Sequence, residues 1–241
     1  YLTGLELSNN GSDANNDIDI AAGKARDSTD VADLSLAASL TKRLDASWAV
    51  GTNQGGLDTG VKANSTWYHL WLIRRSDTAV VDVLFSTSAT APTMPANYDS
   101  KRRIGSVLTD GSGNLRGFVQ NHDHFQWKAA IKDIDVSNLG TTVTGFTMST
   151  PPGFKIRGTF HYDMTGQSSR TVYFQSPNIT DASASTSAVP YGHTPKDSAT
   201  QGPNGQITIE TNTSSQIKLS SSAANTTIVV LTDGWVDIRG K

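Results

Sequence analysis

The chain has 241 residues, and its 20 Lys and Arg nearly balance its 22 Asp and Glu, which gives a formal net charge of −2. This length suits one large β domain or two small ones, since all-β domains reach about 200–250 residues. Balanced charge argues against a nucleic-acid coat or a membrane-surface protein, both of which carry a basic excess. No apolar run approaches the ~20 residues of a membrane-spanning helix, so we expect no membrane insertion.

The composition favours strands over helices. Of the 22 acidic residues, 20 are Asp and only Glu6 and Glu210 are Glu. Glu is a good helix former, whereas Asp, Ser, Thr, Asn and Gly prefer caps, turns and strands. Cysteine is absent, which excludes disulfides, thiolate metal sites and cysteine nucleophiles. Because the chain begins with Tyr1, we expect a processed chain or a fragment of a longer one.

The first quarter of the chain alternates short strand patterns with polar turns. Residues 1–8 and 17–22 alternate apolar and polar side chains, which predicts strands on either side of a polar loop. Residues 27–45 are the best helix candidate, because their apolar positions fit helical and strand periods about equally, and we favour strand with a short helical turn. Residues 51–60 contain four glycines and predict a loop with unusual backbone angles.

Two hairpins are predicted in the middle of the chain. Residues 67–73 are apolar on both strand faces, which indicates a central strand buried on two sides. Residues 80–86 are predicted to form its hairpin partner. Residues 103–108 and 115–120 flank the sequence Asp110-Gly111-Ser112-Gly113-Asn114, and turn chemistry of this kind between alternating runs is typical of a hairpin.

The second half also predicts strands, separated by turns and one long loop. The loop is residues 181–205, where large apolar side chains are few. The strands are expected over residues 125–136, 141–149, 154–162, 170–176, 206–211, 216–220, 226–231 and 235–238.

A strand spacing of about ten residues is typical of a sandwich. We therefore predict an all-β fold with little helix, namely an antiparallel β-sandwich of jelly-roll-like type. We prefer a single domain over residues 1–241 and leave open a subdivision near residues 128–140, where the strand pattern is weakest.

His122-Asp123-His124 is the triplet that most resembles a site. In a strand the two imidazoles would lie on one face, where they could bind a metal ion. A metal site needs at least a third ligand, and none accompanies the triplet at a recognisable spacing. We therefore favour a solvated hairpin or strand end, predict no metal site, and keep His122 and His124 as ligand-binding candidates.

Oxygen-bearing side chains occupy alternate positions near the N-terminus: Asp13, Asn15, Asp17 and Asp19. This spacing resembles the start of a calcium-binding loop. The sixth position of such a loop should be Gly and is Ile18, and the twelfth should be Glu and is Lys24. We favour side chains that cap turns, with an irregular oxygen-ligand site as the alternative.

No catalytic constellation stands out. With 20 aspartates, close carboxylate pairs arise by chance and are uninformative for glycosidase chemistry. No Gly-x-Ser-x-Gly context supports Ser/His/Asp catalysis, and residues 51–60 lack the Lys-Ser or Lys-Thr ending of a phosphate-binding loop. We predict no enzyme activity and no cofactor.

Aromatic side chains are the remaining candidates for ligand contact, because aromatic faces stack on pyranose rings. Core packing is the competing role for aromatic residues, and it is favoured for Trp67 and Trp71 in the two-sided strand. Trp127 stays a ligand-binding candidate. Tyr191 and His193, in the predicted long loop, are better placed for exposure.

Several longer phrases of the sequence point to a family. They include Asn16-Asp17-Ile18-Asp19-Ile20, Lys42-Arg43-Leu44-Asp45, residues 51–60, Arg74-Arg75-Ser76 and Arg102-Arg103-Ile104-Gly105-Ser106. Together they resemble the C-terminal region of virion proteins of tailed bacteriophages and prophages, of the tail-fibre or receptor-binding type. The resemblance is strong over the first 125 residues and the last 30, and weak across residues 140–205.

This resemblance implies a β-rich, non-catalytic structural protein of the virion tail that acts outside the cell. Such a protein would assemble as a homotrimer, contact other phage tail proteins and bind a host-surface glycan or receptor, without a nucleic-acid partner. One alternative is a purely architectural head-decoration or tail-tip subunit. Another is a tailspike glycan depolymerase, against which the lack of a repetitive β-helix pattern argues.

Overall fold

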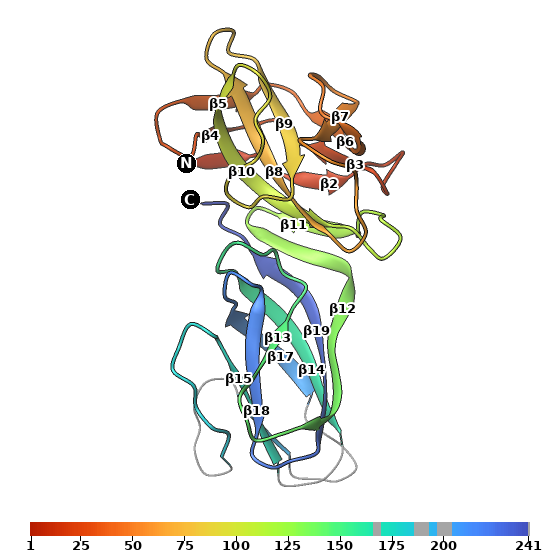
Figure 1. The fold of residues 1–241 in the computed structure, drawn as a ribbon, viewed down its shortest axis with the longest axis vertical. Helices are drawn as coiled ribbons and strands as arrows, with labels where there is room; N and C mark the ends of the chain where they lie inside the picture. The colour runs from red at the N-terminus through yellow and green to blue at the C-terminus, as the bar shows by residue number, and fades with distance from the viewer. Residues whose placement is uncertain (166–169, 186–192, 197–203, 241) are drawn as a thin grey trace. The chain divides into compact units, whose positions relative to one another are not determined.

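The chain folds into strands that form two compact units (Figure 1). The computed structural model describes residues 1–165, 170–185, 193–196 and 204–240, and over these ranges it contains no helix. Unit 1 comprises Tyr1–Lys128 and Asp237–Lys241, and unit 2 comprises Ala129–Val236. The all-β prediction is confirmed. The division between the units falls at one end of the region 128–140.

Unit 1 contains a seven-stranded sheet and a three-stranded sheet. Its strands are β1 (Leu2–Gly4), β2 (Leu7–Asn9), β3 (Asp17–Ile20), β4 (Gly23–Arg26), β5 (Asp33–Leu36), β6 (Leu40–Ser47), β7 (Gln54–Leu57), β8 (Trp67–Arg75), β9 (Val81–Ser86), β10 (Tyr98–Leu108), β11 (Phe118–Asn121) and the first part of β12 (His124–Leu139). The large sheet has the order β10-β8-β9-β7-β6-β3-β2, and the small one β1-β4-β5. The pairs β6–β7 and β7–β9 are parallel, so the large sheet is mixed and not purely antiparallel.

The predicted two-sided strand is β8, which lies between β10 and β9. Leu70 and Leu72 are fully buried on one face. On the other face Trp71 and Ile73 are buried in a cluster that includes Leu84 of β9. The strand and its hairpin with β9 are therefore confirmed.

Residues 27–45 contain strands β5 and β6 and no helical turn. Leu34 and Leu36 are buried in β5 while the alternate residues Asp33 and Ser35 are exposed, which is the period-2 pattern of a strand with one buried face. The strand interpretation is confirmed. In place of the expected helical turn the segment has one hydrogen-bonded turn, in which the Asp30 nitrogen donates to the Asp27 carbonyl at 3.1 Å. Tertiary burial on a sheet decided between two periods that the sequence matched equally.

Residues 51–60 are not a continuous loop, because β7 lies within them. Gly55 is required by close approach, since a Cβ there would lie 2.0 Å from the carbonyl oxygen of Ser47 in β6. At Gly56 a Cβ would lie 2.7 Å from the Phe85 ring of β9. The central glycines thus let β7 fit between its two neighbours. Of the four glycines, only the terminal Gly51 and Gly60 have positive φ angles, at 105° and 77°, and Asn53 between them has a φ of 59°.

The second predicted hairpin forms its turn but not its strand pairing. Asp110 Oδ1 accepts hydrogen bonds from the backbone nitrogens of Ser112 and Asn114, at 2.8 and 2.9 Å. Beyond the single bridge between Thr109 and Leu115 the strands separate. β10 continues in the large sheet, whereas β11 pairs with the start of β12. The prediction of an extended hairpin is wrong for this reason.

Over its described residues, unit 2 forms a jelly roll of eight strands. After β12 its strands are β13 (Thr144–Thr147), β14 (Arg157–Thr165), β15 (Arg170–Gln175), β16 (His193–Lys196), β17 (Asn204–Glu210), β18 (Gln216–Ser221) and β19 (Thr226–Val236). One sheet has the order β12-β19-β14-β17 and the other β13-β18-β15-β16. The chain is therefore a long hairpin, in which β12 pairs with β19, β13 with β18, β14 with β17 and β15 with β16, rolled into two sheets. This is jelly-roll topology, which was predicted from the sequence over residues 1–241 and which the structure has in unit 2.

The two sheets of unit 2 enclose one apolar core. Phe160 and Met164 of β14 belong to it from one sheet, and Val172 and Phe174 of β15 from the other. All four side chains are buried. Unit 2 thus has a core of its own, which is the defining property of an independent domain.

Candidate functional site

The His122-Asp123-His124 triplet forms the tip of the β11–β12 hairpin. Asn121 and His124 are the last paired residues, and His122 has a positive φ of 55° in the turn. The His122 side chain is 86% exposed, and its Nδ1 lies 2.7 Å from Asn121 Oδ1. The solvated hairpin is therefore what forms. Among the described residues no group of three or more His, Asp or Glu side chains is placed to hold a metal ion.

The other predicted ligand-binding residues are not gathered at one place. Trp127 is only 3% exposed and its ring lies 5.8 Å from that of Trp67, so its faces are closed to a sugar. His193 lies in β16, where its backbone is opposite Tyr173 of β15. Tyr191 lies outside the described residues.

Of the alternating oxygen-bearing residues near the N-terminus, Asp13 caps a turn. Asp13 Oδ1 accepts hydrogen bonds from the backbone nitrogens of Asn15 and Asn16, each at 3.2 Å. The side-chain amide of Asn16 also donates to Asp13 and is the largest cause of a lowered Asp13 pKa, to which the two backbone bonds contribute. Asp19 points elsewhere and contributes to a groove.

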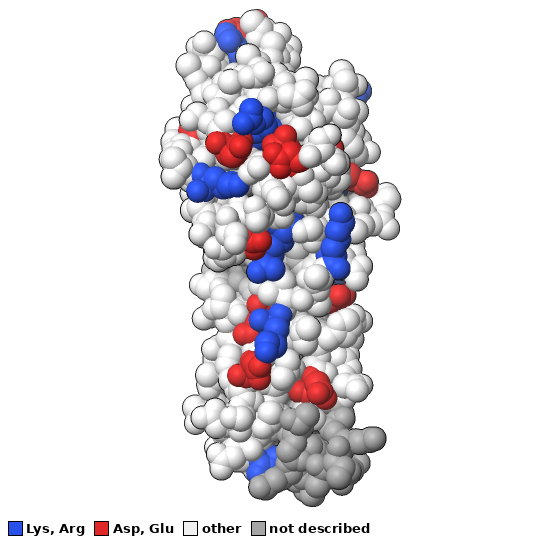
Figure 2. All heavy atoms as spheres, turned by 90° about the vertical axis from the view of Figure 1, so that its right-hand side faces the viewer, with Lys and Arg blue, Asp and Glu red and all other residues white. Residues whose placement is uncertain are grey.

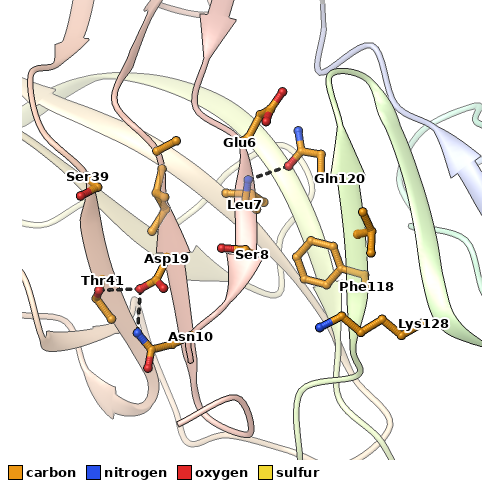
Figure 3. Close-up of a pocket in the computed structure, with 13 residues that line it drawn as sticks. Glu6, Leu7, Ser8, Asn10, Asp19, Ser39, Thr41, Phe118, Gln120 and Lys128 are labelled. Carbon is orange, nitrogen blue, oxygen red and sulfur yellow. Dashed lines mark hydrogen bonds between the residues drawn. The ribbon is translucent and has the colours of Figure 1, made fainter. Parts of the chain in front are cut away.

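This groove, of about 690 Å³, lies between β2 and β11 (Figure 3). β2 is the edge strand of the large sheet, and β3 and β6 follow it in the sheet order. Asp19 of β3 and Thr41 of β6 line one side, and Phe118 of β11 and Lys128 of β12 line the other. All of these residues belong to unit 1.

Side-chain amides, and not backbone pairing, join β2 to β11. Asn9 Oδ1 accepts a hydrogen bond from the Phe118 nitrogen at 3.1 Å, and Asn9 Nδ2 donates to the Arg116 carbonyl at 3.3 Å. The Leu7 nitrogen donates to Gln120 Oε1 at 2.7 Å. The Asn9 amide therefore occupies the place of one peptide unit of an intervening strand. The two strand edges are held apart, and the groove runs along the gap.

One side of the groove has a carboxylate in a fixed orientation. Asp19 Oδ1 accepts hydrogen bonds from Asn10 Nδ2 at 2.8 Å and from Thr41 Oγ1 at 2.6 Å (Figure 3). Asp19 Oδ2 has no hydrogen-bond partner within the described parts of the chain. A carboxylate oxygen held in this way is a preorganised acceptor for a ligand donor.

On the opposite side of the groove lies the ammonium group of Lys128, and the placement of this side chain depends on Gly117. The backbone nitrogen of Lys128 donates to the Gly117 carbonyl at 2.9 Å, and the Lys128 side chain lies over Gly117. A Cβ at position 117 would be 3.1 Å from Lys128 Cδ, closer than most such contacts. Lys128 Nζ forms no ion pair or hydrogen bond with the residues described, so it is available as a donor.

A second polar cluster of unit 1 contains a Ser–His contact but is closed. His69 Nδ1 lies 2.8 Å from Ser106 Oγ, and Arg103 contacts both Ser106 Oγ at 3.2 Å and Asp237, to which it donates two hydrogen bonds of 2.6 and 2.5 Å. Burial, together with the Arg103 charge, lowers the pKa of His69 to about 4. His69 and Ser106 are each 1% exposed. A substrate does not reach this pair, so its role is structural.

Lys42 and Asp82 form a second closed cluster, with an Nζ–Oδ1 distance of 2.8 Å. Lys42 Nζ also donates to the carbonyls of Ala49 and Gly51, at 2.6 and 3.0 Å. Its ammonium lies 5.4 Å from the centre of the Trp48 ring. Burial lowers the pKa of Lys42, and the Asp82 carboxylate partly offsets this effect. All three ammonium protons therefore have an acceptor.

Sequence reasoning missed the groove and both closed clusters. It considered Asp19 only as a turn cap, with an irregular oxygen-ligand site as the alternative, and it overlooked Lys128. A signal for Lys128 was present, because Gly117 and Lys128 lie on opposite arms of a predictable hairpin about the His122-Asp123 turn. Asn9 gave no signal, since its partner Phe118 is 109 positions away.

Neither a protein-family model nor a curated protein sequence matches this chain. In the described parts of the chain there is no helix of the length and apolarity needed to cross a membrane. Figure 2 shows basic and acidic side chains interspersed over the face that it presents. That face offers no extended basic area to a phosphate backbone.

Proposed function

We propose that this chain is a non-catalytic component of a bacteriophage tail, of the fibre or receptor-binding type, which attaches the virion to a glycan on the host surface. The observation that carries the binding role is the groove between β2 and β11, which combines hydrogen-bond donors and acceptors with apolar side chains. The assignment to a virion tail is based on the family resemblance of the sequence.

The jelly roll of unit 2 supports this proposal at the level of architecture. Jelly rolls occur in viral capsid proteins and in lectins. Because one fold serves many functions, the topology adds weight to the proposal but does not carry it.

A symmetric assembly would strengthen attachment through such a groove. Several weak sites that act together exceed the affinity of one site by orders of magnitude, and closed cyclic symmetry is the usual form of a soluble oligomer. We propose a homotrimer, which would have a mass of three times 25.7 kDa, about 77 kDa. Light scattering after size exclusion tests this, and a mass of 25.7 kDa at all concentrations would contradict it.

The attachment function is tested with the fluorescently labelled chain and a panel of bacterial strains. We expect binding to a subset of strains, and loss of binding after mild periodate treatment, which cleaves the vicinal diols of surface glycans. Binding to none of the strains, or binding insensitive to periodate, would overturn the proposal. Release of soluble oligosaccharides from the bound cells would instead identify a depolymerase.

A further inference from the structure

We infer that the groove between β2 and β11 binds a neutral, hydroxyl-rich sugar unit. The inference rests on the proposed function and specifies the ligand and the residues that recognise it. Four features of the groove carry it: a fixed acceptor, free donors, an apolar strip and the sign of the local charge.

The fixed acceptor is Asp19 Oδ2. Its partner oxygen Oδ1 is held by Asn10 and Thr41, at 2.8 and 2.6 Å. Neither bond needs to break when Oδ2 accepts a ligand hydroxyl, so the carboxylate loses little conformational freedom on binding. Hydrogen bonds to an ionised acceptor are about twice as strong as neutral ones.

The free donors are Lys128 Nζ and two hydroxyls. Ser8 and Ser39 line the groove and are exposed, and within the described residues their hydroxyls have no hydrogen-bond partner. A hydroxyl both donates and accepts, as does each hydroxyl of a sugar. The groove therefore matches a ligand whose polar groups are themselves of both kinds.

Apolar side chains lie between these polar groups. Val119 and Ala21 line the groove with exposed side chains, and Val119 is 54% exposed although it lies in a strand, whereas Phe118, which also lines the groove, is only 3% exposed and offers little surface. A pyranose ring has C–H groups on its faces and hydroxyls on its rim, so its faces suit such a strip. A fully hydrophilic ligand of equal size would leave Val119 without a contact.

The charge of the groove selects against acidic ligands. Glu6 and Asp19 contribute two carboxylates and Lys128 one ammonium. The sum is −1 at neutral pH, and like charges brought together oppose binding. This favours neutral sugars over uronic acids and phosphorylated sugars.

The test is a titration of the ¹⁵N-labelled chain, followed by heteronuclear NMR. The neutral probes are maltotriose, lactose and mannobiose, and the acidic probe is trigalacturonate. We expect at least one neutral probe to shift the amide signals of Ser8, Asp19 and Thr41, with no such shift for trigalacturonate. Absence of shifts with all four probes, or a stronger response to trigalacturonate, would overturn the inference.

A variant pair establishes which residue acts. Asp19→Asn keeps the shape but replaces the free acceptor with a donor, and we expect at least a tenfold loss of affinity for the neutral probe. Asp135→Asn removes an equal charge from an exposed side chain of unit 2 and should leave the affinity unchanged. Equal affinities of the two variants would contradict the role of Asp19. Amide signal dispersion of each variant confirms that it is folded.

Cell attachment separates this inference from the proposed function. If Asp19→Asn attaches to cells as the wild-type chain does, the groove assignment is wrong and the attachment function stands. If the wild-type chain binds a neutral probe in the groove but attaches to no cell, the proposed function is wrong and the groove assignment stands.

Discussion

Buried basic side chains fix the positions of several irregular segments of unit 1. Arg102 Nε donates to the carbonyl of Arg239 at 3.1 Å, and Arg103 pairs with Asp237. Arg239 in turn contacts Asp123 at 3.1 Å. Lys42 fixes the segment after β6 by donating to the carbonyls of Ala49 and Gly51. Each of these charged groups has at least one acceptor, as burial of a charge requires, although Arg239 Nε is buried without a hydrogen-bond partner among the described residues.

For the buried Lys42–Asp82 pair, we expect the single variant Lys42→Met to lose more free energy of unfolding than the double variant. Lys42→Met leaves the Asp82 carboxylate buried without its counter-charge, which typically costs about 3–5 kcal/mol. Adding Asp82→Asn removes the uncompensated charge, so the double variant should recover part of that loss. Urea unfolding gives the free energies.

An exposed pair provides the control for this experiment. Arg75 and Asp77 are 2.6 Å apart at the surface, and Arg75→Met should shift the unfolding midpoint little, because solvent screens such pairs. Equal stability of the single and double variants at Lys42 and Asp82 would contradict the expected difference.

His69 predicts a pH dependence of stability. Its pKa is lowered to about 4 in the folded chain, against about 6.5 when unfolded. Between these values the unfolded state binds a proton that the folded state does not, so stability falls as the pH falls from 6.5 to 4. The contribution is about 3 kcal/mol over this window.

The measurement compares wild-type and His69→Gln chains in urea at pH 7 and pH 4.5. Carboxylates titrate in both chains, so the difference in how steeply their free energies of unfolding change with pH is due to His69. We expect the variant to have the shallower slope. Parallel slopes, or a His69 imidazole that titrates near pH 6.5 by NMR, would contradict the buried neutral state.

At the scale of elements, the amide bridge protects two strand edges. An unpaired edge can pair with another chain and aggregate. The Asn9 side chain accepts a hydrogen bond from the Phe118 nitrogen of β11, and the Gln120 side chain accepts one from the Leu7 nitrogen of β2. These bonds leave room for the groove. The same bonds thus cover the edges and set the width of the site.

Asn9→Ala should therefore loosen the β2–β11 junction. The Phe118 amide and the Arg116 carbonyl lose their partner, and each net hydrogen bond is worth about 1 kcal/mol. Hydrogen exchange should accelerate at Phe118 but not at Leu72, which lies in the central strand β8. Equal acceleration at both amides would indicate global destabilisation in place of a local bridge.

The elements that could be predicted are those with an unambiguous local pattern. β8 was evident because both faces of 67–73 are apolar, and most strands of unit 2 because their alternation is regular. β16 was missed, because it lies within residues 181–205, which predicted a loop. β7 was missed because Gly55 and Gly56 have no side chain to alternate. Their need for close approach depends on β6 and β9, which the local sequence does not show.

The candidate site could largely not be predicted from local sequence patterns, because it too depends on which strands become neighbours. Its sides come from strands near residues 8, 19, 41, 118 and 128, and only the sheet order brings them together. Burial of Lys42 was equally hidden, because a lone Lys in a strand predicts a solvated side chain. Its partner Asp82 lies 40 positions further along the chain.

At the scale of the whole molecule, unit 2 is inserted within the sequence of unit 1. Because unit 2 encloses its own core, we expect residues 129–236 to fold when expressed alone, with dispersed NMR signals and cooperative thermal unfolding. In the same segment Phe160→Ala should cost about 3–5 kcal/mol, since Phe160 is fully buried. A segment without cooperative unfolding would contradict the independence of this unit.

The ion pair between Arg103 and Asp237 has a consequence for the order of events during synthesis. The two residues are 134 positions apart, so a ribosome that adds 5–20 residues per second needs on the order of 10 s to go from one to the other. During that interval the nascent N-terminal unit holds a guanidinium whose counter-ion has not been made. We therefore expect the half of the protein that is translated first to complete its packing only after residue 237 has been synthesised.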